Sequence, residues 1–255
     1  MNISALRLAL CLLAGGAAAS EGTVIKIDTR PGISITSHYL KRDNATATLL
    51  LFTGGGGSIA LRDGEPRSIN FLIRNRGLFA AQGFNVFSIG RPTDKADLDG
   101  HFRSSPEHVE DIRKVVAWLK ADTGKPVWLV GTSTGTISVA AGAIGLGNEI
   151  AGAVLTSSIT SYRIPGAPGQ QALENIRVPV LVMHHERDQC HACLASGTGW
   201  IMRGLKNAAA KKLLLVDGGK DPTGDPCEPL HWHGYINMDD EAVRLISDWI
   251  RQPGS

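Results

Sequence analysis

The sequence predicts an α/β fold in which a mostly parallel central sheet carries helices on both faces. Short apolar runs of strand length alternate with segments of helical periodicity along the chain, and this alternation is typical of parallel strands joined by helical crossovers. The aromatic fraction is only 5%, whereas glycine supplies 30 of the 255 residues, which favours close packing of helices on a sheet. A chain of this length can build one such domain, which we expect over residues 21–255.

The first twenty residues (1–20) have the composition of a secretory signal peptide. Arg7 supplies a positive charge, Leu8–Ala14 is apolar, and small residues continue to Ser20. Spanning a bilayer takes ~20 consecutive apolar residues, so this shorter run favours a cleaved export signal over a membrane anchor. We therefore expect cleavage near Ala19 and a periplasmic or secreted mature chain without stable membrane insertion.

Two strand patterns open the mature chain. Apolar and polar residues alternate over residues 22–40 on either side of Arg30-Pro31-Gly32, which predicts an antiparallel hairpin at the edge of the sheet. Thr46–Phe52 is a strand candidate buried on both faces. Further strands are expected at 84–89, 126–130, 150–155, 178–183 and 212–216, and helices at 70–82, 105–122, 136–143, 195–207 and from Asp239 onward.

The most informative stretch is the apolar run Pro126–Val130, which stops at Gly131-Thr132-Ser133-Thr134-Gly135. A sharp turn from strand to helix holds its central residue in strained backbone geometry, where bulky neighbours would collide and glycine does not. The start of the helix also leaves unpaired backbone N–H groups close to the serine. Ser133 is therefore a candidate nucleophile.

A serine hydroxyl is a weak nucleophile at neutral pH, so Ser133 needs a base, an acid that orients the base, and donors for an oxyanion. Asp188 follows the strand expected at 178–183 and is the candidate acid. His233 is the candidate base, because the glycine after it lets the loop turn toward the site. The order serine, aspartate, histidine is the one used on this architecture. His231 is an alternative base, and Asp217, Asp221 and Asp225 are alternative acids.

Together these motifs resemble the α/β-hydrolase superfamily over residues 24–251. The resemblance rests on Gly131–Gly135, on Phe52-Thr53 with the four glycines that follow, on Asp188 and on His233-Gly234. It implies the α/β-hydrolase fold, with Ser133 as nucleophile, Asp188 as acid and His233 as base. Because the connection over residues 157–176 is short, we expect a minimal lid.

The resemblance also implies an oxyanion hole made of two backbone N–H groups. One belongs to Thr134, the residue after the nucleophile. The other comes from the glycine loop at Gly55 or Gly54, where the backbone can approach a ligand closely. Many members have His-Gly where this chain has Thr53-Gly54, so the second donor stays open between these two glycines.

The mature chain contains three cysteines, and export favours a disulfide between two of them. Cys190 lies two residues after the candidate acid, and Cys227 six residues before the candidate base. A Cys190–Cys227 bridge would join the two loops that must meet and leave Cys193 free. Cys193–Cys227 is the alternative pairing.

A metal site competes with this interpretation, because histidines and cysteines gather at the ends of the late strands in numbers sufficient for zinc. Cys190-His191-Ala192-Cys193 lacks a second matched pair in the sequence, and a redox Cys-x-x-Cys usually follows the first strand of a thioredoxin-like unit. We therefore expect no metal and no cofactor, and we interpret His184 and His185 as structural. The full set of candidate ligands is His184, His185, Cys190, His191, Cys193, Cys227, His231 and His233.

The sequence therefore predicts a serine hydrolase that forms an acyl-enzyme from a small-molecule ester, with amides, thioesters and lactones open to the same chemistry. A noncatalytic binding protein on the same fold is the alternative. The net charge of +2, with no run of like charges, argues against a nucleic-acid partner. Oligomeric state and acyl preference stay open. Residues of the loops 58–69 and 91–104 are candidate substrate contacts, among them Arg62, Arg67, Arg91 and His101.

Overall fold

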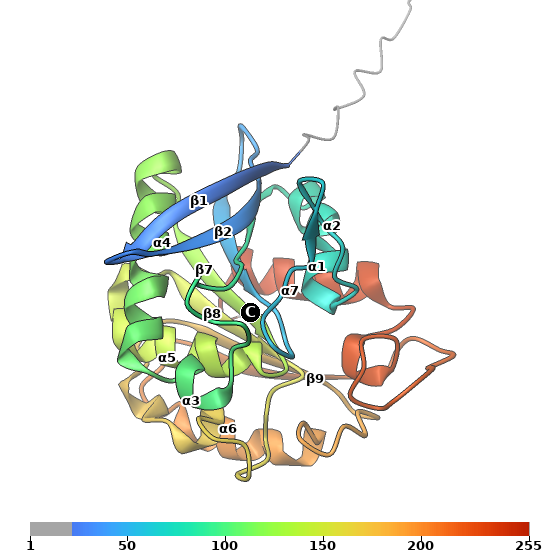
Figure 1. The fold of residues 1–255 in the computed structure, drawn as a ribbon. Coiled ribbons are helices and arrows are strands. Elements are labelled where there is room, and N and C mark those ends of the chain that lie inside the picture. The colour runs from blue at the N-terminus through green and yellow to red at the C-terminus, as the bar shows by residue number, and fades with distance from the viewer. Residues whose placement is uncertain (1–21, 255) are drawn as a thin grey trace, which may run out of the picture.

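A computed structural model describes residues 22–254, with an eight-stranded sheet at its centre (Figure 1). The predicted signal peptide and its cleavage near Ala19 lie outside the described residues. The strands of this sheet are β1 (Thr23–Arg30), β2 (Ile33–Leu40), β3 (Ala47–Phe52), β6 (Phe84–Ser88), β7 (Val127–Thr132), β8 (Gly152–Thr156), β9 (Val180–His185) and β10 (Lys211–Val216). A separate small hairpin pairs β4 (Leu61–Arg62) with β5 (Glu65–Pro66).

The strand order is β1-β2-β6-β3-β7-β8-β9-β10. The β1–β2 hairpin lies at one edge, and β2 pairs antiparallel with β6. The pairings among the other strands are all parallel. This arrangement confirms the predicted mostly parallel sheet with an antiparallel N-terminal edge, and it collects the C-terminal ends of β3, β7, β8 and β9 along one rim.

Helices cover both faces of the sheet, as predicted (Figure 1). One apolar core contains side chains of α4, α5 and α6, and the other contains side chains of α1, α2 and α7. No helix among residues 22–254 is both long and apolar enough to cross a membrane. The α-helices are α1 (Phe71–Arg74), α2 (Arg76–Ala81), α3 (Gly100–Arg103), α4 (Pro106–Thr123), α5 (Gly135–Leu146), α6 (Thr198–Gly204) and α7 (Asp239–Arg251).

Short 3-10 helices occupy several connections. The segment between β8 and β9 contains only two of them, so the predicted minimal lid is confirmed. They are η1 (Gly147–Glu149), η2 (Pro168–Gln170), η3 (Leu173–Asn175), η4 (Ala195–Gly197) and η5 (Trp232–Gly234).

Local sequence explains the ends of α4. The Ser105 side chain accepts a hydrogen bond from the His108 N–H, Pro106 occupies the first turn, and Gly124 ends the helix with φ of 65°. A capping serine, a proline in the first turn and a left-handed glycine at the end are the expected helix signals. The strand candidate at 46–52 is confirmed as β3, in which every residue is buried.

Two local predictions were wrong. The single helix expected over 70–82 is divided into α1 and α2 at Asn75, whose side-chain amide donates to the Asp239 carboxylate. The polar segment at 93–104 contains α3, because the Asp99 carboxylate accepts from the Phe102 N–H at 2.8 Å and caps a short helix. Both differences come from side-chain hydrogen bonds, which cannot be predicted from the spacing of apolar residues.

Candidate active site

Ser133 lies at a strained turn between β7 and α5. Its φ is 54°, a left-handed conformation that is uncommon for residues other than glycine. A Cβ at Gly131 would lie 2.6 Å from the Val139 side chain, and one at Gly135 only 2.2 Å from the Phe52 carbonyl oxygen. The Ser133 N–H donates to the Thr156 carbonyl at 3.1 Å. The flanking glycines therefore allow this turn, as the sequence predicts.

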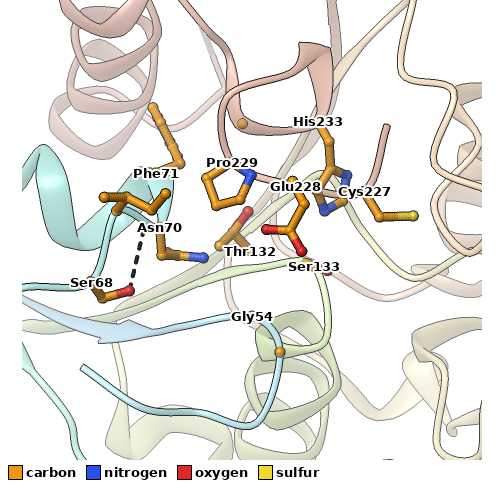
Figure 2. Close-up of a pocket in the computed structure, with 13 residues that line it drawn as sticks. Gly54, Ser68, Asn70, Phe71, Thr132, Ser133, Cys227, Glu228, Pro229 and His233 are labelled. Carbon is orange, nitrogen blue, oxygen red and sulfur yellow. Dashed lines mark hydrogen bonds between the residues drawn. The ribbon is translucent and has the colours of Figure 1, made fainter. Parts of the chain in front are cut away.

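The candidate acid and base are in direct contact. The Nδ1 atom of His233 lies 2.8 Å from Oδ2 of Asp188, although 45 residues separate them in the chain. Oδ1 of Asp188 accepts from the Cys190 N–H at 2.9 Å, and Nε2 of His184 lies 3.3 Å from Oδ2. The other ring nitrogen of His233 is directed toward Ser133 (Figure 2). The structure therefore brings together the three residues predicted as the triad.

Asp188 is 4% exposed, and burial alone would raise the pKa of its carboxyl group. Hydrogen bonds from His184 and His233, the charge of His233 and the Cys190 N–H outweigh burial and lower this pKa from 3.8 to about 2. Asp188 is therefore a carboxylate at neutral pH, suited to accept the Nδ1 proton of His233. His184, interpreted from the sequence as structural, helps to hold the acid.

The loop that carries His233 is anchored from behind. The Ser157 hydroxyl donates to the His233 carbonyl at 2.7 Å, and the Tyr235 hydroxyl donates to the Met183 carbonyl at 2.8 Å. Ser157 and Tyr235 are both buried and both have positive φ, 42° and 56°. Sequence reasoning missed these two residues, because their role depends on contacts between distant segments.

The alternative base and acids do not meet the triad. His231 packs edge-on against Trp232 and contacts neither Ser133 nor Asp188. The Asp225 carboxylate accepts from the Cys227 N–H. Within residues 22–254, neither Asp217 nor Asp221 contacts His233 through its carboxylate.

Within the described part of the chain, the backbone N–H groups of Gly54, Gly55 and Thr134 beside Ser133 have no hydrogen-bond acceptor, so the second donor stays open between the two glycines. Gly55 and Thr134 are linked, because the Thr134 hydroxyl donates to the Gly55 carbonyl at 2.8 Å. A Cβ at Gly54 would lie 2.9 Å from that of Ser133, so glycine is needed for the loop to approach the serine this closely. Unpaired, pre-oriented donors of this kind suit an oxyanion.

A cavity of about 270 Å³ opens over Ser133 and His233 (Figure 2). Asn70 and Phe71 border it on the side of α1, and Glu228 and Pro229 on the side of the base loop. Sequence reasoning missed these lining residues. Of the two loops predicted to contact substrate, 58–69 contributes Ser68 and Ile69 to the lining, whereas none of Arg62, Arg67, Arg91 and His101 lines this cavity. The full lining is Gly54, Gly55, Ser68, Ile69, Asn70, Phe71, Thr132, Ser133, Cys227, Glu228, Pro229, His233 and Gly234.

The predicted disulfide between Cys190 and Cys227 is present, which confirms this pairing over Cys193–Cys227. It joins the acid loop to the base loop. Cys193 is a buried free thiol, and burial and the charge of Asp188 raise its pKa, although a hydrogen bond with Ser133 opposes them. It is therefore protonated at neutral pH.

Two groups of side chains place potential metal-ligating atoms within 4.8 Å of one another in the described chain. One contains Cys190, Cys193 and His233, and the other Cys190, His191 and Cys227. Both use the sulfur of Cys190, which is bonded to Cys227. Because thiolates are the sulfur ligands of zinc, neither group is a complete donor set while the disulfide is intact.

The fold is similar to that of several solved structures. An esterase from Pyrococcus furiosus has a TM-score of 0.66 at 12% identity, covering 92% of this chain and 92% of that one. A dienelactone hydrolase from Anabaena variabilis has a TM-score of 0.65 at 14% identity, covering 91% of this chain and 97% of that one. An α/β serine hydrolase without a lid from Xanthomonas campestris has a TM-score of 0.62 at 14% identity, covering 92% of this chain and 97% of that one.

The comparisons by sequence give no match: no protein-family model matches the chain, and no curated protein matches it. The structural likeness at low identity concerns the fold alone. The chain has the α/β-hydrolase fold, as the sequence motifs predict.

Proposed function

We propose that this α/β-hydrolase-fold chain is a serine hydrolase that cleaves a carboxylic ester through an acyl-enzyme. Ser133 is the nucleophile, His233 the base and Asp188 the acid. The observation that carries the proposal is the 2.8 Å contact of Asp188 with His233 beside a strained serine turn on the same cavity. The neighbours described as esterases and as a dienelactone hydrolase support the same class of chemistry.

In this mechanism, Nε2 of His233 takes the hydroxyl proton of Ser133 as Oγ attacks the ester carbonyl carbon. The Asp188 carboxylate holds the Nδ1 proton and stabilises the imidazolium. The tetrahedral oxyanion accepts hydrogen bonds from the N–H groups of Gly55 and Thr134. Collapse breaks the carbon–oxygen bond to the alcohol, which receives the proton from His233. In the second half of the reaction, His233 takes a proton from a water molecule as the water attacks the acyl-enzyme carbonyl. Collapse of that intermediate releases the carboxylic acid product and returns the proton to Ser133 Oγ.

Two further features belong to the proposal. Amides, thioesters and lactones present a carbonyl carbon to the same nucleophile, base and oxyanion donors, so they are the alternative substrate classes. The chain acts outside the cytoplasm after removal of residues 1–20. The Cys190–Cys227 disulfide supports this location, because such bonds persist in oxidising compartments.

A hydrolysis screen tests the proposal. Purified chain is assayed on p-nitrophenyl esters of increasing acyl length, with the matching anilides as amide controls. We expect ester hydrolysis that falls by at least about 10³-fold in Ser133→Ala and in His233→Ala. His231→Ala is the matched control and should keep wild-type activity, because its ring contacts neither Ser133 nor Asp188.

Activity that survives in Ser133→Ala, or that chelators abolish while serine-directed inhibitors do not, would contradict the proposal. A chain that binds esters without hydrolysing any of them would instead be the noncatalytic binding protein.

A further inference from the structure

Arg103, at the end of α3, is the most deeply buried cation of the described chain. Its side chain is 1% exposed, and no carboxylate within residues 22–254 forms an ion pair with it. Burial lowers its pKa to about 10, against the weaker influence of Asp99, so it is charged at neutral pH. Burying an unpaired charge costs several kcal/mol, and its hydrogen bonds must therefore compensate.

Those hydrogen bonds lead to the glycine loop beside Ser133. Nη2 of Arg103 donates to the carbonyl oxygens of Thr53 at 3.2 Å and Gly55 at 3.0 Å. Nε donates to the Leu98 carbonyl at 3.1 Å, and Nη1 to the Ser138 hydroxyl at 3.0 Å. One guanidinium thus ties the loop to α3 and α5, using the planar set of donors that lysine lacks.

The two carbonyls held by Nη2 flank the peptide that joins Gly54 to Gly55. The carbonyl of that peptide is held as well, because Gly54 O accepts from the Gly57 N–H at 3.2 Å. Because the neighbouring peptide planes on both sides are fixed, the Gly54–Gly55 peptide is also fixed. The Gly55 N–H therefore has one orientation. The same Gly55 carbonyl accepts from the Thr134 hydroxyl at 2.8 Å, so the oxygen that Arg103 holds links Gly55 to Thr134, the two residues whose N–H groups are the proposed oxyanion donors.

A buried pair behind Arg103 keeps the guanidinium in place. The Ser138 hydroxyl lies 2.9 Å from Nε2 of His108. Burial, with the charges of Arg103 and Arg30, lowers the pKa of His108 to about 3, so its ring is neutral and Nε2 can accept the hydroxyl proton. Ser138 then offers its lone pairs to Nη1 of Arg103.

We propose that Arg103 is a positioning residue for the oxyanion hole: it holds the Gly54–Gly55 peptide so that the Gly55 and Thr134 N–H groups converge on one point beside Ser133. The inference rests on the proposed function and assigns to it a residue 30 positions before the nucleophile. Arg103 acts through the backbone and does not itself line the cavity.

The test compares an ester with the thionoester of the same acyl and leaving groups, in wild type, Arg103→Lys and Arg103→Met. The thiono sulfur accepts hydrogen bonds poorly, so the hole contributes little to its hydrolysis. We expect kcat for the ester to fall by about 10- to 100-fold with little change in KM. The ratio of kcat/KM for ester over thionoester should fall by a similar factor, which a general loss of folded enzyme would not produce.

Arg30→Met is the matched control. Arg30 is partly buried, with Nε 2.8 Å from Asp111 Oδ1, but it does not touch the glycine loop. Its variant should lower Tm and leave the ester-to-thionoester ratio unchanged. If Arg103→Met fails to fold, Arg103→Lys and Ser138→Ala, which removes the Nη1 contact, supply the same ratio.

Equal losses on ester and thionoester, or wild-type kcat in the folded Arg103 variants, would overturn the positioning role while leaving the hydrolase proposal intact. Ester hydrolysis that persists in Ser133→Ala would overturn both. The two failures are thus distinguished by which variant departs from expectation.

Discussion

Asp188, the proposed acid, is one residue that should affect both catalysis and stability. Its pKa lies below the unfolded value of 3.8, at about 2, so its contribution to folding is fully present above about pH 4 and is lost as pH falls toward 2. A shift of this size corresponds to roughly 2 kcal/mol. Asp188→Asn should remove this part of the acid dependence and lower kcat by about 10⁴-fold.

Urea unfolding of wild type and Asp188→Asn at pH 5, 4, 3 and 2 measures the first effect, and ester hydrolysis at pH 7 the second. The stability difference between the proteins should shrink between pH 4 and 2. A difference that is constant over this range would show that the Asp188 carboxylate is not held as described.

Ser157 supports the base from the back of the site. Ser157→Ala removes the hydroxyl that donates to the His233 carbonyl at 2.7 Å and leaves a buried acceptor without its partner. We expect a loss of about 1–3 kcal/mol of stability together with a lower kcat. Thermal unfolding and ester kinetics report the two effects. The neighbouring Ser158 is a matched control, since it is equally buried and its hydroxyl has no hydrogen-bond partner among residues 22–254. Ser158→Ala should be nearly neutral.

Glu228 is the one side chain with a full negative charge in the cavity lining. Its carboxylate should disfavour substrates with an anionic acyl group. Glu228→Gln is expected to raise kcat/KM for a carboxylate-bearing ester by about 2- to 5-fold, the size typical of an exposed charge pair, and more at low ionic strength. The neutral ester of the same length is the internal control. An equal change on both esters would show that Glu228 acts on something other than charge.

Sequence order was sufficient to predict three candidate residues that the fold places at one rim, because Ser133, Asp188 and His233 each follow a strand whose C-terminal end lies there. It was not sufficient for Ser157 or Arg103. Ser157 meets the base across 76 positions and Arg103 meets Gly55 across 48. Nothing in the local sequence of either residue differs from an ordinary turn or helix end, so only the folded chain reveals their contacts.

Among the larger elements, the disulfide between Cys190 and Cys227 joins two loops. The two cysteines are 37 positions apart in the sequence. Closing a loop of this length stabilises a chain by about 2–4 kcal/mol in the entropic description. The double variant Cys190→Ser/Cys227→Ser should lose stability by this amount. Its kcat should also fall, because the acid and base loops are no longer tied together.

Chemical denaturation and ester kinetics measure these effects. Cys193→Ser is the control for the denaturation experiment, because it removes a cysteine and leaves the disulfide in place. Thiol titration of the processed, denatured chain without reductant should detect one free cysteine. Three free cysteines in exported protein would contradict the disulfide.

The elements also show where periodicity stops being informative. It places β3, β7, α4 and α7, whose apolar patterns are long and regular. It misses the break between α1 and α2, because Asn75 turns its amide to Asp239, a residue of another helix. It misses α3 for a different reason: a four-residue helix held by one Asp99 cap is too short to have a period.

In the whole molecule, the parallel sheet brings residues that are far apart in the sequence together at one rim. β3 supplies the glycine loop, β7 the serine turn and β9 the acid, and the chain beyond β10 returns with the base. Sequence motifs alone identify this fold because each lies at the end of a strand. The solved structures at 12–14% identity show that the fold tolerates extensive change in sequence.

Covalent labelling tests whether Ser133 is an activated nucleophile. Wild type and Ser133→Ala are incubated with a fluorophosphonate probe, and the adduct is located by mass spectrometry of the peptides. We expect one phosphonyl group per chain on Ser133, slow labelling in His233→Ala, and none in Ser133→Ala. An unlabelled wild type, or equal labelling of Ser133→Ala, would contradict the account.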